Sequence, residues 1–76
     1  MDRIKAFGIA VKKLRLERGL TQENLAEKAE LHVNSVSLIE RGLNPPALDT
    51  ICSLADSLDV KVSDLLARME TCGDIG

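Results

Sequence analysis

This chain has few of the residues that mark secreted, membrane-spanning or metal-binding proteins. It contains one aromatic residue, Phe7, one histidine, His32, and two cysteines, Cys52 and Cys72, with no CxxC pair. No apolar run approaches the roughly 20 residues that span a bilayer, and the first ten residues lack a hydrophobic signal core. Two cysteines in such a chain are expected to be reduced thiols rather than a disulfide. These absences predict a cytoplasmic protein without metal or cofactor.

Catalytic patterns are also absent. The chain has no Ser–His–Asp set, no glycine-rich phosphate-binding loop and no cluster of metal-ligating side chains. With one histidine and no carboxylate pair beside it, neither acid–base nor metal chemistry has a candidate site. We therefore expect a protein that is not an enzyme.

The composition predicts an all-α domain. The two prolines, Pro45 and Pro46, are adjacent, and β-branched residues never cluster into a strand, whereas leucine, alanine and glutamate are plentiful. A length of 76 residues allows one domain. We expect this domain to span residues 1–70, with residues 71–76 as a flexible C-terminal tail.

Charge is unevenly distributed along the chain. The formal net charge is −2, which by itself argues against nucleic acid as a partner. Residues 1–18, however, carry six basic and two acidic side chains, whereas residues 45–76 carry two basic and six acidic ones. A basic first helix beside an acidic remainder is compatible with a locally basic binding face, although charged helix faces are usually only solvated.

Hydrophobic periodicity predicts five helices, over about residues 3–18, 22–29, 33–41, 48–58 and 63–69. Gly19 and Gly42 are helix stop signals, and Thr21 is a good N-cap for the second helix. Cys52 falls on the apolar side of the fourth helix, where we expect a small core residue. The other expected core residues are Ile4, Phe7, Val11, Leu14, Leu25, Ala26, Ala29, Leu31, Val36, Ile39, Ile51, Leu54, Ala55 and Leu58.

The most informative stretch is Gln22 to Arg41, which reads as two short helices joined by a tight turn. Ala26 provides a small contact where these helices would cross. In the second of them Val36, Ile39 and Glu40 face the protein. The outward face carries mostly small or polar side chains: Val33, Asn34, Ser37, Leu38 and Arg41. By itself, this pattern also fits a helical hairpin in any small bundle.

Three longer motifs favour a more specific interpretation. They are GIAVKKLRLERGLTQENLAEKA, SVSLIERGLNPP and LADSLDVKVSDLL, which together cover about residues 7–68. At these spacings the chain resembles the phage-repressor or Cro-like helix-turn-helix family, also called the xenobiotic-response-element type. Its size is similar to that of restriction–modification controller proteins and small phage-type repressors. The resemblance implies a compact five-helix bundle, a lambda-repressor-like DNA-binding domain, whose third helix enters the major groove of double-stranded DNA.

The resemblance also implies residue roles. Gln22 matches a glutamine that grips a phosphate and buttresses the third helix, and helix N-termini favour anions. Asn34 can bond adenine in a bidentate way, and Val33 can touch a thymine methyl group. The full set of implied DNA-binding residues is Thr21, Gln22, Val33, Asn34, Ser35, Ser37, Leu38, Arg41 and Asn44.

The same resemblance pairs Arg15 with Glu40 as a structural salt bridge between the first and third helices. Several positions depart from the family pattern. Glu30 stands where the turn usually has glycine, which costs on the order of 1 kcal/mol in a left-handed conformation. Three expected N-cap positions hold residues that we expect to cap poorly, at a cost of about 1 kcal/mol each: His32, Ala47 and Lys61.

The resulting functional hypothesis is a sequence-specific transcriptional regulator that binds a pseudo-palindromic operator as a homodimer. Leu65, Leu66 and Met69 in the fifth helix form the expected dimer interface. The alternative is an antitoxin-like or regulatory module that uses the same fold to bind another protein. The acidic C-terminal half and the exposed positions expected for Leu38 and Leu43 favour that alternative.

Overall fold

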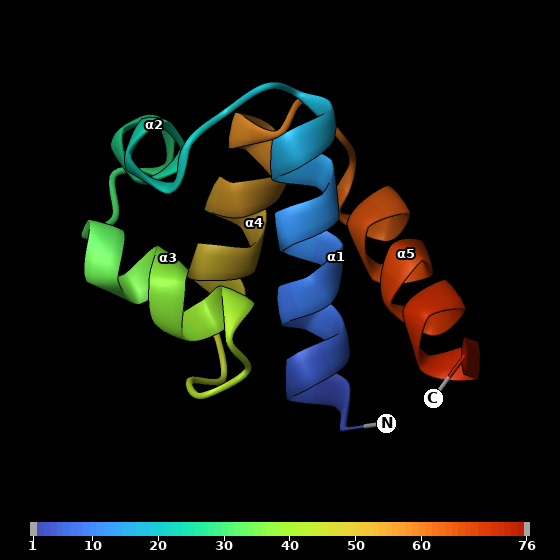
Figure 1. Cartoon of the computed structure of the whole chain (residues 1–76). Coiled ribbons are helices and arrows are strands. Elements are labelled where there is room, and N and C mark those ends of the chain that lie inside the picture. The colour runs from blue at the N-terminus through green and yellow to red at the C-terminus, as the bar shows by residue number, and fades with distance from the viewer. Residues whose placement is uncertain (1, 76) are drawn as a thin grey trace.

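The computed structural model describes the backbone of residues 2–75 and the side chains of residues 2–69, and five α-helices include most of this chain (Figure 1). They are α1 (Arg3–Glu17), α2 (Gln22–Ala29), α3 (Val33–Glu40), α4 (Leu48–Ser57) and α5 (Val62–Ile75). Residues 2–75 contain no strand, so the expected all-α five-helix bundle is confirmed. Within this range, no helix is long and apolar enough to cross a membrane.

Helices α1 and α2 begin where side chains accept hydrogen bonds from the first free backbone N–H groups. The Asp2 carboxylate accepts a hydrogen bond from the Ile4 N–H at 2.8 Å at the start of α1. Before α2, the Thr21 hydroxyl accepts from the Asn24 N–H at 3.0 Å, and the Asn24 side chain accepts from the Thr21 N–H at 3.2 Å. This reciprocal capping box stabilises the start of α2. Ala47, before α4, provides no side-chain cap, as expected.

Two helices are followed by glycine in the left-handed region. Gly19 has a φ of 69° after α1, and Gly42 has a φ of 73° after α3. Glycine adopts this conformation without a steric penalty, and it reverses the chain direction at a helix end. Both stop signals expected from the sequence are therefore confirmed.

The hydrophobic core receives side chains from all five helices. Most of the expected core residues are buried, while Ile51 and Leu31 pack against the core from its edge and Ile4 is only half-buried outside it. The buried cluster consists of Phe7, Ala10, Val11, Leu14, Leu25, Ala26, Ala29, Val36, Ile39, Leu54, Ala55, Leu58 and Leu65.

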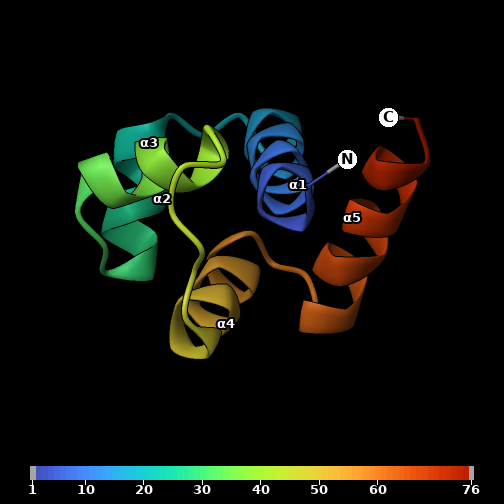
Figure 2. The same cartoon turned by 90° about the horizontal axis from the view of Figure 1, so that it is seen from below.

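Helix α1 lies between α3 and α5, as the view along its axis shows (Figure 2). Helix α2 packs against both α3 and α4, and α4 also contacts α5. In this arrangement α3 packs against α1 and α2, and its opposite face is exposed to solvent. The bundle thus presents α3 at its surface with two helices supporting it from behind.

Three expectations from the sequence are wrong. Cys52 is exposed rather than in the core, because α4 turns only the face with Leu54, Ala55 and Leu58 inward. Leu65 is fully buried, so it is unavailable for a dimer interface. Helix α5 continues to Ile75 instead of ending near Met69. The side chain of Cys72, the other cysteine expected to be reduced, lies outside the described residues.

An exposed ion pair connects α5 to the end of α1. Arg68 donates two hydrogen bonds to the Glu17 carboxylate, at 2.6 and 3.0 Å. These hydrogen bonds, and then the nearby positive charge, hold the pKa of Glu17 below its usual value. Because both side chains are largely in water, the pair is expected to contribute little to stability.

Candidate nucleic-acid interface

A buried ion pair joins α1 to the last residue of α3. Arg15 Nε donates to Glu40 Oε2 at 2.7 Å, and Arg15 Nη2 donates to Glu40 Oε1 at 3.1 Å. Arg15 Nη1 donates to the Leu20 carbonyl at 2.8 Å. Both charged residues are 8% exposed. The structure therefore contains the Arg15–Glu40 pair that the sequence resemblance implied.

Helix α2 is bonded to the same carboxylate. Gln22 Nε2 donates to Glu40 Oε1 at 3.0 Å, so Glu40 receives hydrogen bonds from residues of α1 and α2. Among the described residues, no buried side-chain nitrogen or oxygen lacks a hydrogen-bond partner. We refer to Arg15, Gln22 and Glu40 as the Glu40 clamp. It fixes the C-terminal end of α3 against both supporting helices.

The turn between α2 and α3 is tight despite lacking glycine. Glu30 adopts the left-handed conformation, with φ 57° and ψ 41°. The Leu31 N–H donates to the Ala26 carbonyl at 2.8 Å, and Ala26 is buried against the rest of the core. The small alanine side chain allows the two helices to approach closely. The strained turn position expected at Glu30 is confirmed.

His32 caps α3, which corrects the expectation that it would be a poor cap. Its Nδ1 accepts a hydrogen bond from the Asn34 N–H at 3.1 Å. The imidazole thus performs the role that a serine or aspartate oxygen usually performs at this position. This acceptor role requires the neutral tautomer whose proton is on Nε2.

The outward face of α3 is a strip of small and polar groups. Asn34 and Arg41 are exposed, and Ser35, Ser37 and Leu38 are half-buried. Val33 is also half-buried and packs against the edge of the core, so it is less free than the sequence suggested. Val36, Ile39 and Glu40 are buried on the opposite face, as expected.

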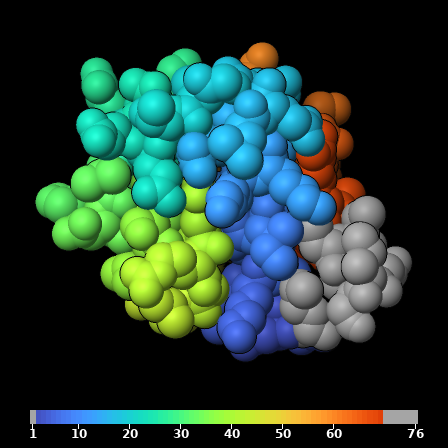
Figure 3. All heavy atoms as spheres, viewed as in Figure 1, coloured from blue at the N-terminus to red at the C-terminus, as the bar shows by residue number. Residues whose placement is uncertain are grey.

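The remaining implied DNA-binding residues lie at the start of α2 and in the loop after α3. Thr21 and Gln22 begin α2, and Asn44 lies exposed in the loop after α3. On the face shown in Figure 3, the start of α2, helix α3 and this loop lie side by side next to α1. The fold therefore brings residues from three segments to one side of the molecule.

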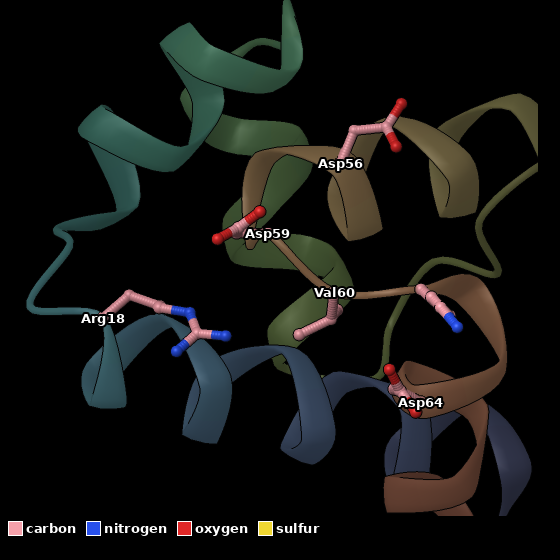
Figure 4. A pocket seen from close by; sticks show the side chains of 6 residues that line it. Arg18, Asp56, Asp59, Val60 and Asp64 are labelled. Carbon is pink, nitrogen blue, oxygen red and sulfur yellow. The ribbon is translucent and has the colours of Figure 1, made fainter.

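Only part of the basic first helix is available to a polyanion. Arg15 is buried in the Glu40 clamp, and Arg18 Nε donates to the Leu58 carbonyl at 2.9 Å. Arg18 lines a surface recess of about 550 Å³ with Asp56, Asp59 and Asp64 (Figure 4). The exposed basic residues of α1 are Arg3, Lys5, Lys12 and Lys13.

Some residues that position α2 and α3 were not identified as functional from the sequence. Asn24 completes the capping box of α2, and a Thr-x-x-Asn search would have found it. Gly8 and Gly42 lie at the contact between α1 and the end of α3, where a side chain would not fit. Nothing in the sequence around Gly8 distinguishes it from any other glycine within a helix.

Two short helices with a tight left-handed turn, a supporting first helix and a free outer face define a helix-turn-helix domain. A family model described as helix-turn-helix matches residues 11–65. The chain belongs to this family, the DNA-binding transcription regulators of the Cro-like, xenobiotic-response-element type. The family is generally non-enzymatic.

Individual relatives agree with this assignment. The transcriptional regulator DdrOP3 of Deinococcus deserti is 41% identical over 64 residues, which are 84% of this chain and 50% of that protein. The chain thus spans about half the length of this relative. The restriction–modification controller protein C.AhdI of Aeromonas hydrophila superposes with a TM-score of 0.80 at 35% identity, covering 82% of this chain and 94% of that one. The controller protein C.Esp1396I, solved as a tetramer on its 35 base-pair operator, gives 0.87 at 26% identity and covers 95% of each chain.

Proposed function

We propose that this chain is a sequence-specific transcriptional regulator that inserts α3 into the major groove of operator DNA. The observation that carries this proposal is the Glu40 clamp, which holds α3 rigidly from behind while its outer face stays free. Three hydrogen bonds from Arg15 and Gln22 to the Glu40 carboxylate orient α3. The polar outer face of α3 stays in contact with water. That arrangement suits a helix whose partner is an external polar surface.

The outer strip matches the chemistry of a base-reading helix. The side-chain amide nitrogen of Asn34 can donate to adenine N7, and its carbonyl oxygen can accept from the adenine N6 amino group, which gives bidentate recognition. Phosphate contacts are proposed for the helix N-terminus at Thr21 and Gln22, and for Arg41 and Asn44. Ser35 and Ser37 provide short hydroxyl donors, and Leu38 provides an apolar contact beside them.

A single α3 reads too few base pairs to select a site, so we propose a two-fold homodimer. Its two recognition helices would lie about 34 Å apart, on a pseudo-palindromic operator. C.Esp1396I, solved as a tetramer on its operator, gives a precedent among similar structures. An operator-binding role also places the protein with the DNA, in the cytoplasm, and requires neither catalysis nor a cofactor.

An apolar groove provides the proposed dimer surface. Its volume is about 250 Å³, and α1, α4, α5 and the loop after α3 contribute to it. Leu66 at its edge is 40% exposed, and Met69 beside it is half-buried. The apolar lining consists of Ile4, Phe7, Pro45, Pro46, Ile51, Leu66 and Met69. A second copy of the chain would remove this surface from water.

The DNA-binding proposal is tested by selecting duplexes from a random or genomic pool with the purified protein. We expect one enriched, two-fold symmetric sequence. Affinity for the selected duplex should fall with salt at a log–log slope of about −0.9 for each phosphate that the protein neutralises. No enriched sequence, or binding that is indifferent to salt, would contradict the proposal.

The dimer proposal predicts that Leu66→Asp converts the protein to a monomer. A charged side chain at this position would have to be buried without a partner in the dimer, which is strongly unfavourable. Sedimentation equilibrium measures the mass of the wild type and the variant. Leu16→Asp is the matched control, because Leu16 is 58% exposed on α1 and does not line the groove. A wild type that stays monomeric, or a Leu66→Asp variant that stays dimeric, would rule out this interface.

A protein-interaction module is the second candidate. Leu43 in the loop after α3 is 57% exposed, and the recess around Arg18 is lined by three aspartates together with Lys61. Such surfaces suit a partner protein better than a polyanion. The DNA selection separates the two candidates, because this module would enrich no sequence.

A further inference from the structure

Helices α1 and α3 meet backbone to backbone at Gly8. A Cβ atom added to Gly8 would lie 2.3 Å from the Ile39 carbonyl oxygen and 2.8 Å from the Glu40 carbonyl oxygen. Both contacts are below 3.0 Å, which real Cβ atoms essentially never show, and the first is shorter by 0.7 Å. The atoms that would be hit belong to the backbone of α3, so no side chain can move aside to make room.

The backbone conformation of α1 does not require a glycine at position 8. Gly8 lies within α1, where glycine is a poor helix former compared with alanine. It is not among the residues with positive φ, which between residues 2 and 75 are Gly19, Glu30, Gly42 and Asp59. The absence of a side chain is therefore needed only for the close approach of α3.

Two further contacts fix the same end of α3. Arg15 lies two turns after Gly8 on the same side of α1 and binds Glu40 in the Glu40 clamp. Gly42, just after α3, lies over Lys5, and a Cβ there would be 2.5 Å from Lys5 Cγ and 2.9 Å from Lys5 Cα. Along α1, the contacts occur in the order Lys5, Gly8 and Arg15. They fix both the separation and the direction of α3 relative to α1.

We propose that Gly8 is a positioning residue that sets the depth and angle at which α3 is presented to the bases. This inference rests on the proposed DNA-binding function. The Gly8 contact is at the C-terminal end of α3, whereas Asn34 lies near its N-terminal end, about 8–9 Å away along the axis. A side chain at position 8 must push the last turn back by several tenths of an ångström. Hydrogen bonds to base edges tolerate little displacement, because their donor–acceptor distances are restricted to about 2.7–3.2 Å.

The test compares Gly8→Ala with Gly19→Ala. Gly19→Ala is the matched control, because it strains a backbone with φ 69° but its Cβ meets nothing within 4 Å. Affinities are measured at a temperature where thermal unfolding shows every variant to be folded. For Gly8→Ala we expect about ten-fold or greater loss of affinity for the selected duplex, comparable to losing one bidentate base contact. Affinity for an unrelated duplex should change less than two-fold, since flexible side chains can still reach phosphates. Gly19→Ala should bind both duplexes like the wild type.

A second measurement does not require DNA. Residual dipolar couplings of backbone amides report the orientation of α3 relative to α1, and we expect it to change in Gly8→Ala and not in Gly19→Ala. If the wild type selects no duplex, the proposed function fails and these couplings alone decide whether Gly8 positions α3. If Gly8→Ala does not fold, Gly42→Asn takes its place, because asparagine tolerates positive φ and its Cβ presses on Lys5. Unchanged orientation in the folded variant, or an unchanged ratio of the two DNA affinities, overturns the inference.

Discussion

Replacing Glu40 with alanine is expected to lower the free energy of unfolding by about 3–5 kcal/mol. The variant leaves the Arg15 guanidinium buried with only the Leu20 carbonyl as a partner, and it also removes the acceptor of Gln22. A domain of this size has a total stability of roughly 5–15 kcal/mol, so much of it would be lost. Urea denaturation followed by circular dichroism at neutral pH measures the difference.

Two further variants test whether the loss of stability in Glu40→Ala comes from leaving a buried charge unpaired. Glu17→Ala removes the carboxylate of the exposed pair with Arg68, and we expect a much smaller change from it because water screens that pair. The double variant Arg15→Met, Glu40→Leu removes both buried charges and should recover most of the stability, because no charge is left unpaired. If Glu40→Ala and Glu17→Ala are equally mild, burial of the Glu40 clamp does not stabilise the fold.

Asn34→Ala is expected to relax sequence selectivity at one base position in each half-site. Loss of a bidentate contact to a base costs about 1–3 kcal/mol of discrimination, equivalent to roughly five- to 150-fold. Because the Asn34 side chain is exposed and its backbone N–H stays capped by His32, stability should change by less than about 0.5 kcal/mol. Repeating the duplex selection with the variant identifies the affected position. An unchanged selected sequence would show that Asn34 does not read a base.

Arg41→Ala is the matched comparison for Asn34→Ala, since both side chains are exposed on the same face of α3. If Arg41 binds a phosphate, its removal weakens all duplexes similarly and reduces the salt slope by about 0.9. Gln22→Ala is less suited to this comparison, because Gln22 also donates to Glu40 and its loss disturbs the Glu40 clamp. The contrast between uniform and position-specific losses separates phosphate contacts from base reading.

The helices were predictable from the sequence because their signals are local. The start of α2 after its Thr21 cap, and the ends at Gly19 and Gly42, follow from cap and glycine signals and from the spacing of apolar residues within a few positions. The Arg15–Glu40 pair was accessible only through resemblance to a family, since the two residues are far apart in the chain. The same is true of the proposed base-reading face of α3.

Other features depended on which elements pack together. A helical repeat indicates which side of α4 or α5 is apolar, but not how wide the buried part is, so Cys52 is exposed and Leu65 is buried. Arg18 belongs to the basic first helix in sequence, yet it binds the Leu58 carbonyl among aspartates. The chain alone therefore determined the helices and the class of fold. The tertiary structure alone decided which charges face solvent and why Gly8 has no side chain, because both depend on contacts between α1 and segments distant in sequence.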